Sequence, residues 1–126
     1  HEVLIHADCK PLCIYANARQ MTELLSNLLS NAIKYNKPGG EVWVTITEED
    51  KEMIIRVRDN GMGIPKESLG RIFERFYRVD KGRSRKQGGT GLGLSIVKHI
   101  AGYYHGTITV QSELEAGTEF TVKIPI

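Results

Sequence analysis

The sequence predicts a two-layer α/β sandwich, in which a mixed, largely antiparallel sheet carries helices on one face. Two pairs of segments with alternating apolar residues are each joined by a short turn, as the strands of hairpins are. An amphipathic helical pattern precedes each pair, and short strand-like stretches open the chain. Hairpin-linked strands interleaved with helices favour a sheet that is covered on a single face.

The N-terminal part is predicted to contain two short strands and one helix. "HEVLIHAD" and "LCIYA" have the composition of short strands. Asn17 is predicted to cap the first helix, with Gln20 three residues later as its capping-box partner. This helix covers "ARQMTELLSNLLSNAIKY" and is expected to end near Tyr35, before the turn cluster "NKPGG".

The rest of the chain is predicted to form two hairpins separated by a long connection. "EVWVTIT" and "MIIRVRD" alternate as strands, and "GTITVQS" and "EFTVKIPI" form the second pair. Residues 60–90 have no strong repeating pattern, which is typical of a functional lid or a disordered linker. Within them, the apolar spacing of "KESLGRIFERFYR" predicts a helix, and another helix is expected from Gly91 to about Tyr104.

Length and composition favour one globular domain of 126 residues, without a membrane span or a signal peptide. The net charge of +2 is too small to imply a nucleic-acid partner, although basic residues are crowded within residues 75–86. Cys9 and Cys13 match no zinc pattern, and one pair of cysteines is no disulfide framework. Both are expected to be packing residues in a reducing compartment.

The first predicted helix has a narrow polar stripe. At 100° per residue, Glu23, Asn27, Asn31 and Lys34 fall within a strip about 80° wide, opposite the apolar side. The stripe can be an ordinary solvated face. Asparagine is a poor helix former, however, and its side-chain oxygen can bind Mg²⁺, while a lysine one turn later can reach phosphates.

An aspartate stands in the register of the buried strand face. In "MIIRVRDNGMGI", Asp59 continues the face of Met53, Ile55 and Val57, so its carboxylate should point inward. It can cap the Asn60–Gly61 turn, or it can accept hydrogen bonds from the exocyclic amine of a ligand such as adenine. Glycines in this turn would let the backbone pass close to a flat base. Thr118 occupies the same kind of position on the last strand.

The glycine-rich segment "GGTGLGL", residues 88–94, leads into the last helix. Glycines before a helix N-terminus free several backbone N–H groups, and the helix dipole favours an anion there. No lysine followed by serine or threonine comes after the glycines, which excludes a Walker A motif, and no strand directly precedes them, which excludes a Rossmann motif. The alternative is a flexible hinge.

In this order, the motifs resemble the catalytic and ATP-binding domain of bacterial sensor histidine kinases. That domain type has the Bergerat fold and is related to gyrase, the Hsp90 chaperones and the MutL repair proteins. "NLLSNAIKY" is similar to the family's N box, "DNGMGI" to its G1 box, "FERFYR" to its F box and "GTGLGL" to its G2 box. The resemblance covers essentially the whole chain, and "FERFYRVDKGRSRKQ", residues 73–87, is similar to the phosphate-sensor branch.

The resemblance implies that Mg²⁺ and ATP bind to a defined set of residues. Asn31 would bind the metal, Asn27, Lys34 and Arg78 would act in catalysis, and Asp59 would receive the adenine amine. The implied nucleotide contacts are Asn27, Asn31, Lys34, Tyr35, Asp59, Gly61, Gly63, Ile64, Tyr77, Arg78, Gly89, Thr90, Gly91, Leu92, Gly93, Leu94 and Thr118. In gyrase-like relatives a glutamate one turn before the metal-binding asparagine is the hydrolytic base. Asn27 replaces it here, which favours phosphotransfer over hydrolysis.

The family's phosphoacceptor motif is absent from this sequence, and all four histidines are expected to be structural or exposed. The resemblance therefore implies transfer of the γ-phosphoryl group to a histidine on a separate dimerisation domain. It also implies a response regulator as an indirect partner. The domain is expected to be monomeric and cytoplasmic, within a membrane-anchored sensor kinase, without a nucleic-acid partner. The alternatives are an anti-sigma type serine kinase, a non-catalytic adaptor and a nucleic-acid module.

Overall fold

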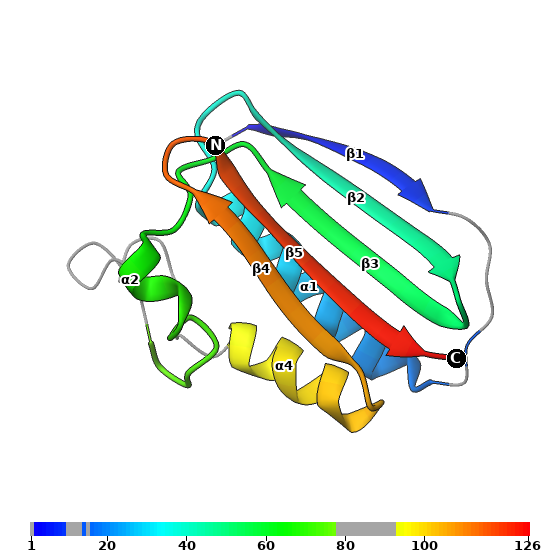
Figure 1. The fold of residues 1–126 in the computed structure, drawn as a ribbon. Coiled ribbons are helices and arrows are strands. Elements are labelled where there is room, and N and C mark those ends of the chain that lie inside the picture. Colours follow the sequence, from blue (N-terminus) through cyan, green and yellow to red (C-terminus); the bar gives the residue numbers. More distant parts are fainter. Residues whose placement is uncertain (1, 10–13, 15, 78–92) are drawn as a thin grey trace.

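The computed structural model describes residues 2–9, 14, 16–77 and 93–126. Its strands lie in one five-stranded sheet, and its two longer helices cover one face of that sheet (Figure 1). In chain order the elements are β1 (Val3–Cys9), α1 (Ala18–Lys34), β2 (Gly40–Glu49), β3 (Glu52–Asp59), α2 (Lys66–Leu69), α4 (Gly93–Tyr103), β4 (Thr107–Glu113) and β5 (Gly117–Pro125).

The sheet is mixed, with the strand order β1-β2-β3-β5-β4. β1 runs parallel to β2, while the other three neighbouring pairs are antiparallel. The helix α1 provides the crossover that a parallel pair requires. The predicted two-layer α/β sandwich, with a largely antiparallel sheet covered on one face, is confirmed.

The core lies between the sheet and the two helices. Cross-strand partners on the covered face are apolar, for example Val57 with its neighbours Val44 and Phe120. From the helices, Leu24 and Leu28 of α1 are fully buried against this face. The alternation of the strands and the apolar side of α1 thus meet in a single cluster, as the hydrophobic patterns predict.

The N-terminus of α1 is held by a capping arrangement that reaches to α4. The side-chain oxygen of Asn17 accepts a hydrogen bond from the backbone N–H of Gln20 at 3.1 Å, as predicted. The hydroxyl of Tyr104, at the end of α4, accepts from the Asn17 N–H at 2.8 Å and donates to the Gln20 side chain. In a capping box the glutamine side chain would itself accept a hydrogen bond from the N-cap N–H. Here the Tyr104 hydroxyl stands between the Asn17 N–H and the Gln20 side chain and bonds to both.

The N-terminal predictions need two corrections. Ile14 and Ala16 of the predicted strand "LCIYA" are not in a strand, and its other residues lie outside the described part of the chain. Cys9 is exposed rather than packed, because β1 is an edge strand and most of its side chains face solvent. Cys13 is not among the described residues.

The predicted helix over residues 66–78 is wrong beyond its first turn. Only α2 is helical, and the chain continues as turns closed by hydrogen bonds between residues three apart, ending at Tyr77. Ile72 is buried, whereas Phe76 has φ +66° and is 65% exposed. Turns that repeat every three residues return apolar side chains to the core at nearly the helical spacing, which is why the pattern resembled a helix.

Within the part of the chain that the structure describes, no helix is long and apolar enough to cross a membrane.

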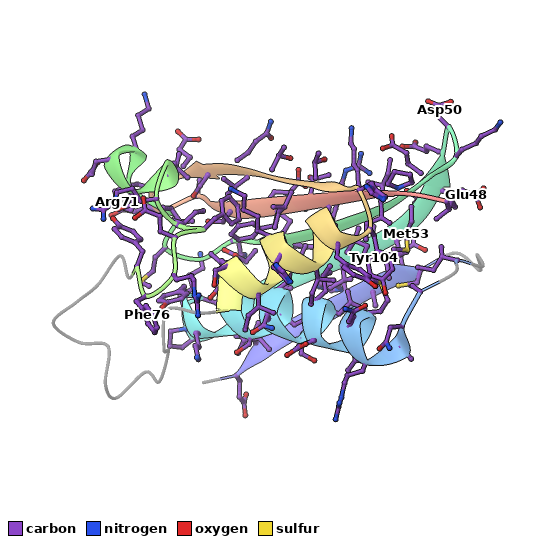
Figure 2. The ribbon with its side chains drawn as sticks, turned by 90° about the horizontal axis from the view of Figure 1, so that it is seen from below. Glu48, Asp50, Met53, Arg71, Phe76 and Tyr104 are labelled. Atoms are coloured by element: carbon purple, nitrogen blue, oxygen red, sulfur yellow. The ribbon has the colours of Figure 1, made fainter. Side chains whose placement is uncertain are left out.

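The two ends of the sandwich carry different elements and side chains. Figure 2 shows Arg71 and Phe76 at the end that carries α2, and Glu48 and Asp50 at the opposite end, where β2 turns into β3.

Candidate functional site

The described parts of the motifs predicted to bind nucleotide converge at one end of the sandwich. The C-terminus of α1, the end of β3, the turn between β4 and β5 and the start of α4 all lie there (Figure 1). Hydrogen bonds join the first three of these segments: Met62 N–H donates to the carbonyl of Tyr35 at 3.1 Å, and Glu115 N–H donates to the carbonyl of Met62 at 2.7 Å. Segments that are far apart in the sequence thus form one continuous surface.

Asp59 lies at the centre of this surface, on the last position of β3. It faces inward, as the register predicts, and only 8% of the residue is exposed. Its Oδ1 accepts a hydrogen bond from the Gly61 N–H at 2.9 Å, and the backbone N–H of Thr118 also bonds to the carboxylate. Burial raises the pKa of Asp59 above its ordinary value, and the two backbone hydrogen bonds partly offset that effect.

Both readings of Asp59 from the sequence are compatible with this geometry. The bond to Gly61 is the turn-capping contact, so that role is present. An ionised carboxylate has about four acceptor positions, and the two backbone donors do not exhaust them. Asp59 therefore keeps acceptor capacity for a ligand amine.

The glycines around Asp59 are required by close backbone contacts. A Cβ atom at Gly61 would lie 2.5 Å from the carbonyl oxygen of Tyr35, and one at Gly63 would lie 2.2 Å from that of Glu113. Gly63 has φ +76°, which disfavours any other residue. Gly117, which the sequence reasoning did not single out, has φ +122°, and a Cβ there would lie 2.0 Å from the Asp59 carbonyl oxygen.

The polar stripe of α1 faces the start of α4. Asn27 and Asn31 are half-buried, and the Asn27 amide nitrogen donates to the carbonyl of Glu23 at 2.8 Å. A Cβ on Gly93 would lie 3.1 Å from Oδ1 of Asn27, so the first residue of α4 is packed against the stripe. Lys34 is half-buried in the last turn of α1.

The chemistry of the stripe fits Mg²⁺ only in combination with phosphate. Among the described residues, no group of three or more histidines, cysteines, aspartates or glutamates could hold a metal. Mg²⁺ usually keeps several waters and binds through one or two protein oxygens together with substrate phosphates. An amide oxygen such as that of Asn31 suits this kind of site, whereas a metal cage built from protein alone is not available in the described part.

Other predicted contacts flank the same end. Tyr77 is half-buried and its hydroxyl donates to Ser68 at 2.8 Å, while the Arg71 guanidinium lies 4.6 Å from the Tyr77 ring centre. Ile64 and Leu94 are partly buried and pack against the core. Leu94 thus helps to anchor α4, and it also lies near the region predicted to bind the phosphates.

Five of the predicted contacts cannot be placed. These residues lie outside the described part of the chain: Arg78, Gly89, Thr90, Gly91 and Leu92. The glycine-rich segment is described only from Gly93, the first residue of α4. The predicted role of the earlier glycines stays a prediction.

Three polar residues that the sequence reasoning did not select organise this end. Ser112 contacts the Ile64 N–H and the Thr118 hydroxyl, at 2.7 and 2.8 Å. Asn36 donates to the Glu41 carbonyl at 3.0 Å, and the Asn60 side chain accepts from the Glu41 N–H at 2.7 Å. Pairing the strands of the second hairpin in register would have placed Ser112 opposite Thr118 and revealed it.

The histidines that the structure describes lie away from this end or at the surface. His6 contacts Glu41 at 2.6 Å and stacks on Trp43. His99 and His105 are exposed. All three agree with the expectation that the histidines are structural or exposed.

Comparisons with known proteins find sensor kinases. A family model described as "Histidine kinase-, DNA gyrase B-, and HSP90-like ATPase" matches residues 16–126. The chain is 47% identical over 112 residues to the sensor histidine kinase RppB of Synechocystis, and 44% identical over 117 residues to the sensor protein SrrB of Staphylococcus aureus. The matches cover 89% and 93% of this chain, but only 25% and 20% of the length of RppB and SrrB, respectively.

Solved structures give the same result. The mycobacterial sensor histidine kinase MprB aligns with a TM-score of 0.87 at 29% identity, covering 98% of this chain and 83% of that one. Full-length ShkA in complex with AMPPNP aligns with a TM-score of 0.83 at 31% identity, covering 98% of this chain and 25% of that one. The chain therefore belongs to the histidine kinase-, DNA gyrase B- and HSP90-like ATPase family, as an ATP-binding catalytic domain of the sensor histidine kinase type.

Proposed function

We propose that this domain binds Mg·ATP at the Asp59 end and donates the γ-phosphoryl group to a histidine on a separate dimerisation domain. The observation that carries the proposal is the buried Asp59 carboxylate, which two backbone N–H groups hold beside a turn that only glycine can form. A buried acceptor with remaining capacity is suited to a ligand that brings a hydrogen-bond donor of its own.

The adenine base is assigned to the turn that follows β3. Its exocyclic amine donates to Asp59, and the backbone at Gly61 and Gly63 lets the flat ring approach without a Cβ atom in the way. Thr118 is the direct cross-strand neighbour of Asp59, which puts a hydroxyl beside the same edge of the base. Tyr35, whose carbonyl touches the turn, lines the base or the ribose.

The phosphates are assigned to the region between α1 and the start of α4. The N–H groups at the first turn of α4 carry the positive end of the helix dipole, which favours an anion there. Lys34 extends from the last turn of α1, and Arg78 and residues 89–92 are proposed to contribute from the connecting segment. Mg²⁺, held by Asn31 and the phosphates, would neutralise charge on the transferred group.

The chemistry fits phosphotransfer better than hydrolysis. The position one turn before Asn31 holds Asn27, whose amide cannot act as a general base, so no described group there activates water. The acceptor would then lie on another part of the protein. The chain spans only 25% and 20% of the length of relatives named a sensor histidine kinase and a sensor protein, which supports its place as one domain of a larger sensor. We propose that this domain is cytoplasmic, within a membrane-anchored sensor that serves a response regulator.

Calorimetric titration tests the binding half of the proposal. Mg·ATP is titrated into the wild-type domain and into Asp59→Asn, with GTP as the nucleotide control. Losing a hydrogen bond to a charged acceptor should weaken ATP binding by about 1.5–3 kcal/mol, roughly 10- to 150-fold. Asp8→Asn, an exposed aspartate on β1, is the matched variant and should bind normally. A folded wild-type domain that binds no ATP would overturn the proposal.

Phosphotransfer in trans tests the catalytic half. The domain is mixed with a separately produced histidine phosphoacceptor domain and γ-labelled Mg·ATP. Acid-labile label on the acceptor, lost when its histidine is replaced by alanine, is expected. Acid-stable label on serine would favour the anti-sigma type serine kinase instead. ATP binding without any transfer to a panel of such acceptors would favour the adaptor.

A further inference from the structure

A row of polar residues ends the covered face of the sheet at the nucleotide end. The register pairs Asp59 of β3 with Thr118 of β5, and Thr118 with Ser112 of β4. The equivalent rows further along these strands are apolar and belong to the core. Three polar side chains next to one another at the rim of a core require a hydrogen-bonding reason.

The hydroxyl of Ser112 is fully committed. It donates to the Gly117 carbonyl at 3.0 Å and accepts from the Ile64 N–H at 2.7 Å. It also lies 2.8 Å from the hydroxyl of Thr118. A serine hydroxyl has one hydrogen, and the Gly117 bond uses it, so Thr118 must be the donor in the contact with Ser112.

This direction of donation fixes what Thr118 can offer to a ligand. Its only hydroxyl hydrogen points to Ser112, so its oxygen presents lone pairs alone. Asp59, when ionised, is also an acceptor without a hydrogen. The two groups that stand side by side at the end of β3 and the start of β5 are then both acceptors.

We infer that Ser112 is a positioning residue that sets the purine specificity of the site through Thr118. Two adjacent acceptors favour the amino group at position 6 of adenine and oppose the oxygen that hypoxanthine and guanine carry there. Ser112 does not touch the base, and it acts by holding the Thr118 hydrogen away from it. The inference rests on the proposed binding of adenine at Asp59, and it adds a residue and a reason for selectivity.

The test compares the affinities of the domain for Mg·ATP and Mg·ITP, whose bases differ at position 6 and in the proton on the neighbouring ring nitrogen. In Ser112→Ala the Thr118 hydroxyl is free to turn its hydrogen toward the 6-oxygen of ITP. The preference for ATP over ITP is expected to fall by about 3- to 10-fold, the range of one neutral hydrogen bond. A loosened Ile64 turn would weaken both nucleotides together and leave their ratio unchanged.

Two further variants separate specificity from stability. Ser112→Thr keeps the hydroxyl and should keep the wild-type ratio. Thr121→Val removes a hydroxyl from the opposite face of β5 and should change neither affinity nor ratio. In the background of Thr118→Val, where no hydroxyl can turn, adding Ser112→Ala should leave the ratio unchanged.

The outcomes distinguish this inference from the proposed function. An unchanged ATP-to-ITP ratio in Ser112→Ala, in a domain that still binds ATP through Asp59, would overturn the role of Ser112 alone. A further fall of the ratio on adding Ser112→Ala to Thr118→Val would also overturn it, because the effect would not pass through Thr118. Absence of ATP binding in the wild type would instead overturn the proposed function.

Discussion

Burial of the Asp59 carboxylate has opposite consequences for stability and for nucleotide binding. Burial raises its pKa in the folded domain above the ordinary value of 3.8. A carboxyl group with a raised folded pKa stabilises the fold most when it is protonated, and this contribution is lost as the pH rises through the folded pKa. The nucleotide, in contrast, needs the ionised acceptor.

Two pH profiles check this opposition. The free energy of unfolding of the wild type minus that of Asp59→Asn, without nucleotide, should decrease as the pH rises from below 3.8 to neutrality. The association constant for ATP should increase over the same range, with its midpoint above that of an ordinary aspartate. A stability difference that increases with pH would contradict the raised pKa.

Tyr104 links the two helices through a single hydroxyl. That hydroxyl accepts from the Asn17 N–H and donates to Gln20, at the first turn of α1. Tyr104→Phe leaves both groups without this partner and should lower the free energy of unfolding by about 1–2 kcal/mol, measured by urea denaturation. Tyr103→Phe is the control, because Tyr103 is 64% exposed, and its effect should stay within about 0.5 kcal/mol. Equal effects of the two substitutions would exclude the bridging role.

At the scale of elements, the turn between β2 and β3 carries strain. Asp50 and Lys51 both have positive φ, at +51° and +62°, as a two-residue hairpin of the primed type requires. Aspartate tolerates this conformation, whereas lysine does so poorly. The Lys51 carbonyl also accepts from the Ile126 N–H at 2.9 Å, so the turn is anchored to the C-terminus.

Lys51→Gly should therefore stabilise the domain by about 0.5 kcal/mol, since relief of the backbone strain exceeds the entropy that glycine adds to the unfolded chain. Lys51→Ala removes the same charge and keeps the strain, so it should give no such gain. Urea denaturation of the three proteins measures the difference. A stabilisation of equal size in the alanine variant would assign the effect to charge instead of backbone conformation.

The elements whose patterns come from the sheet and from α1 could be predicted, because burial on one face imposes a period that the sequence shows directly. The segment after α2 could not, since its turns repeat every three residues and Phe76 then departs with positive φ. Asp59 was found through its strand register. Ser112 was missed because its role depends on the cross-strand pairing and on which hydroxyl donates, and neither is visible in a single segment.

At the scale of the whole molecule, the Tyr104 bridge and the nucleotide site lie at opposite ends of the sandwich. The Tyr104 bridge lies at the start of α1. The turn that follows Asp59 contacts Tyr35, the residue after the last turn of α1, about 25 Å away along the 17 residues of the helix. The turn at Lys51 is also at the far end (Figure 1). Packed elements join the two ends, but no described hydrogen bond of the Tyr104 bridge involves a residue of the nucleotide end.

Thermal unfolding with and without Mg·ATP tests this separation. At a free concentration 100 times the dissociation constant, ATP should stabilise the wild type by about 2.7 kcal/mol, roughly 10 °C in Tm for a domain of this size. Tyr104→Phe should start from a lower Tm and Lys51→Gly from a higher one, and both should keep the ATP-induced shift. Asp59→Asn at the same ATP concentration should lose about half to nine-tenths of the shift, because its dissociation constant is expected to be roughly 10- to 150-fold higher. If Tyr104→Phe loses the shift as well, the two ends are coupled through α1, and the far end becomes a place from which nucleotide binding can be controlled.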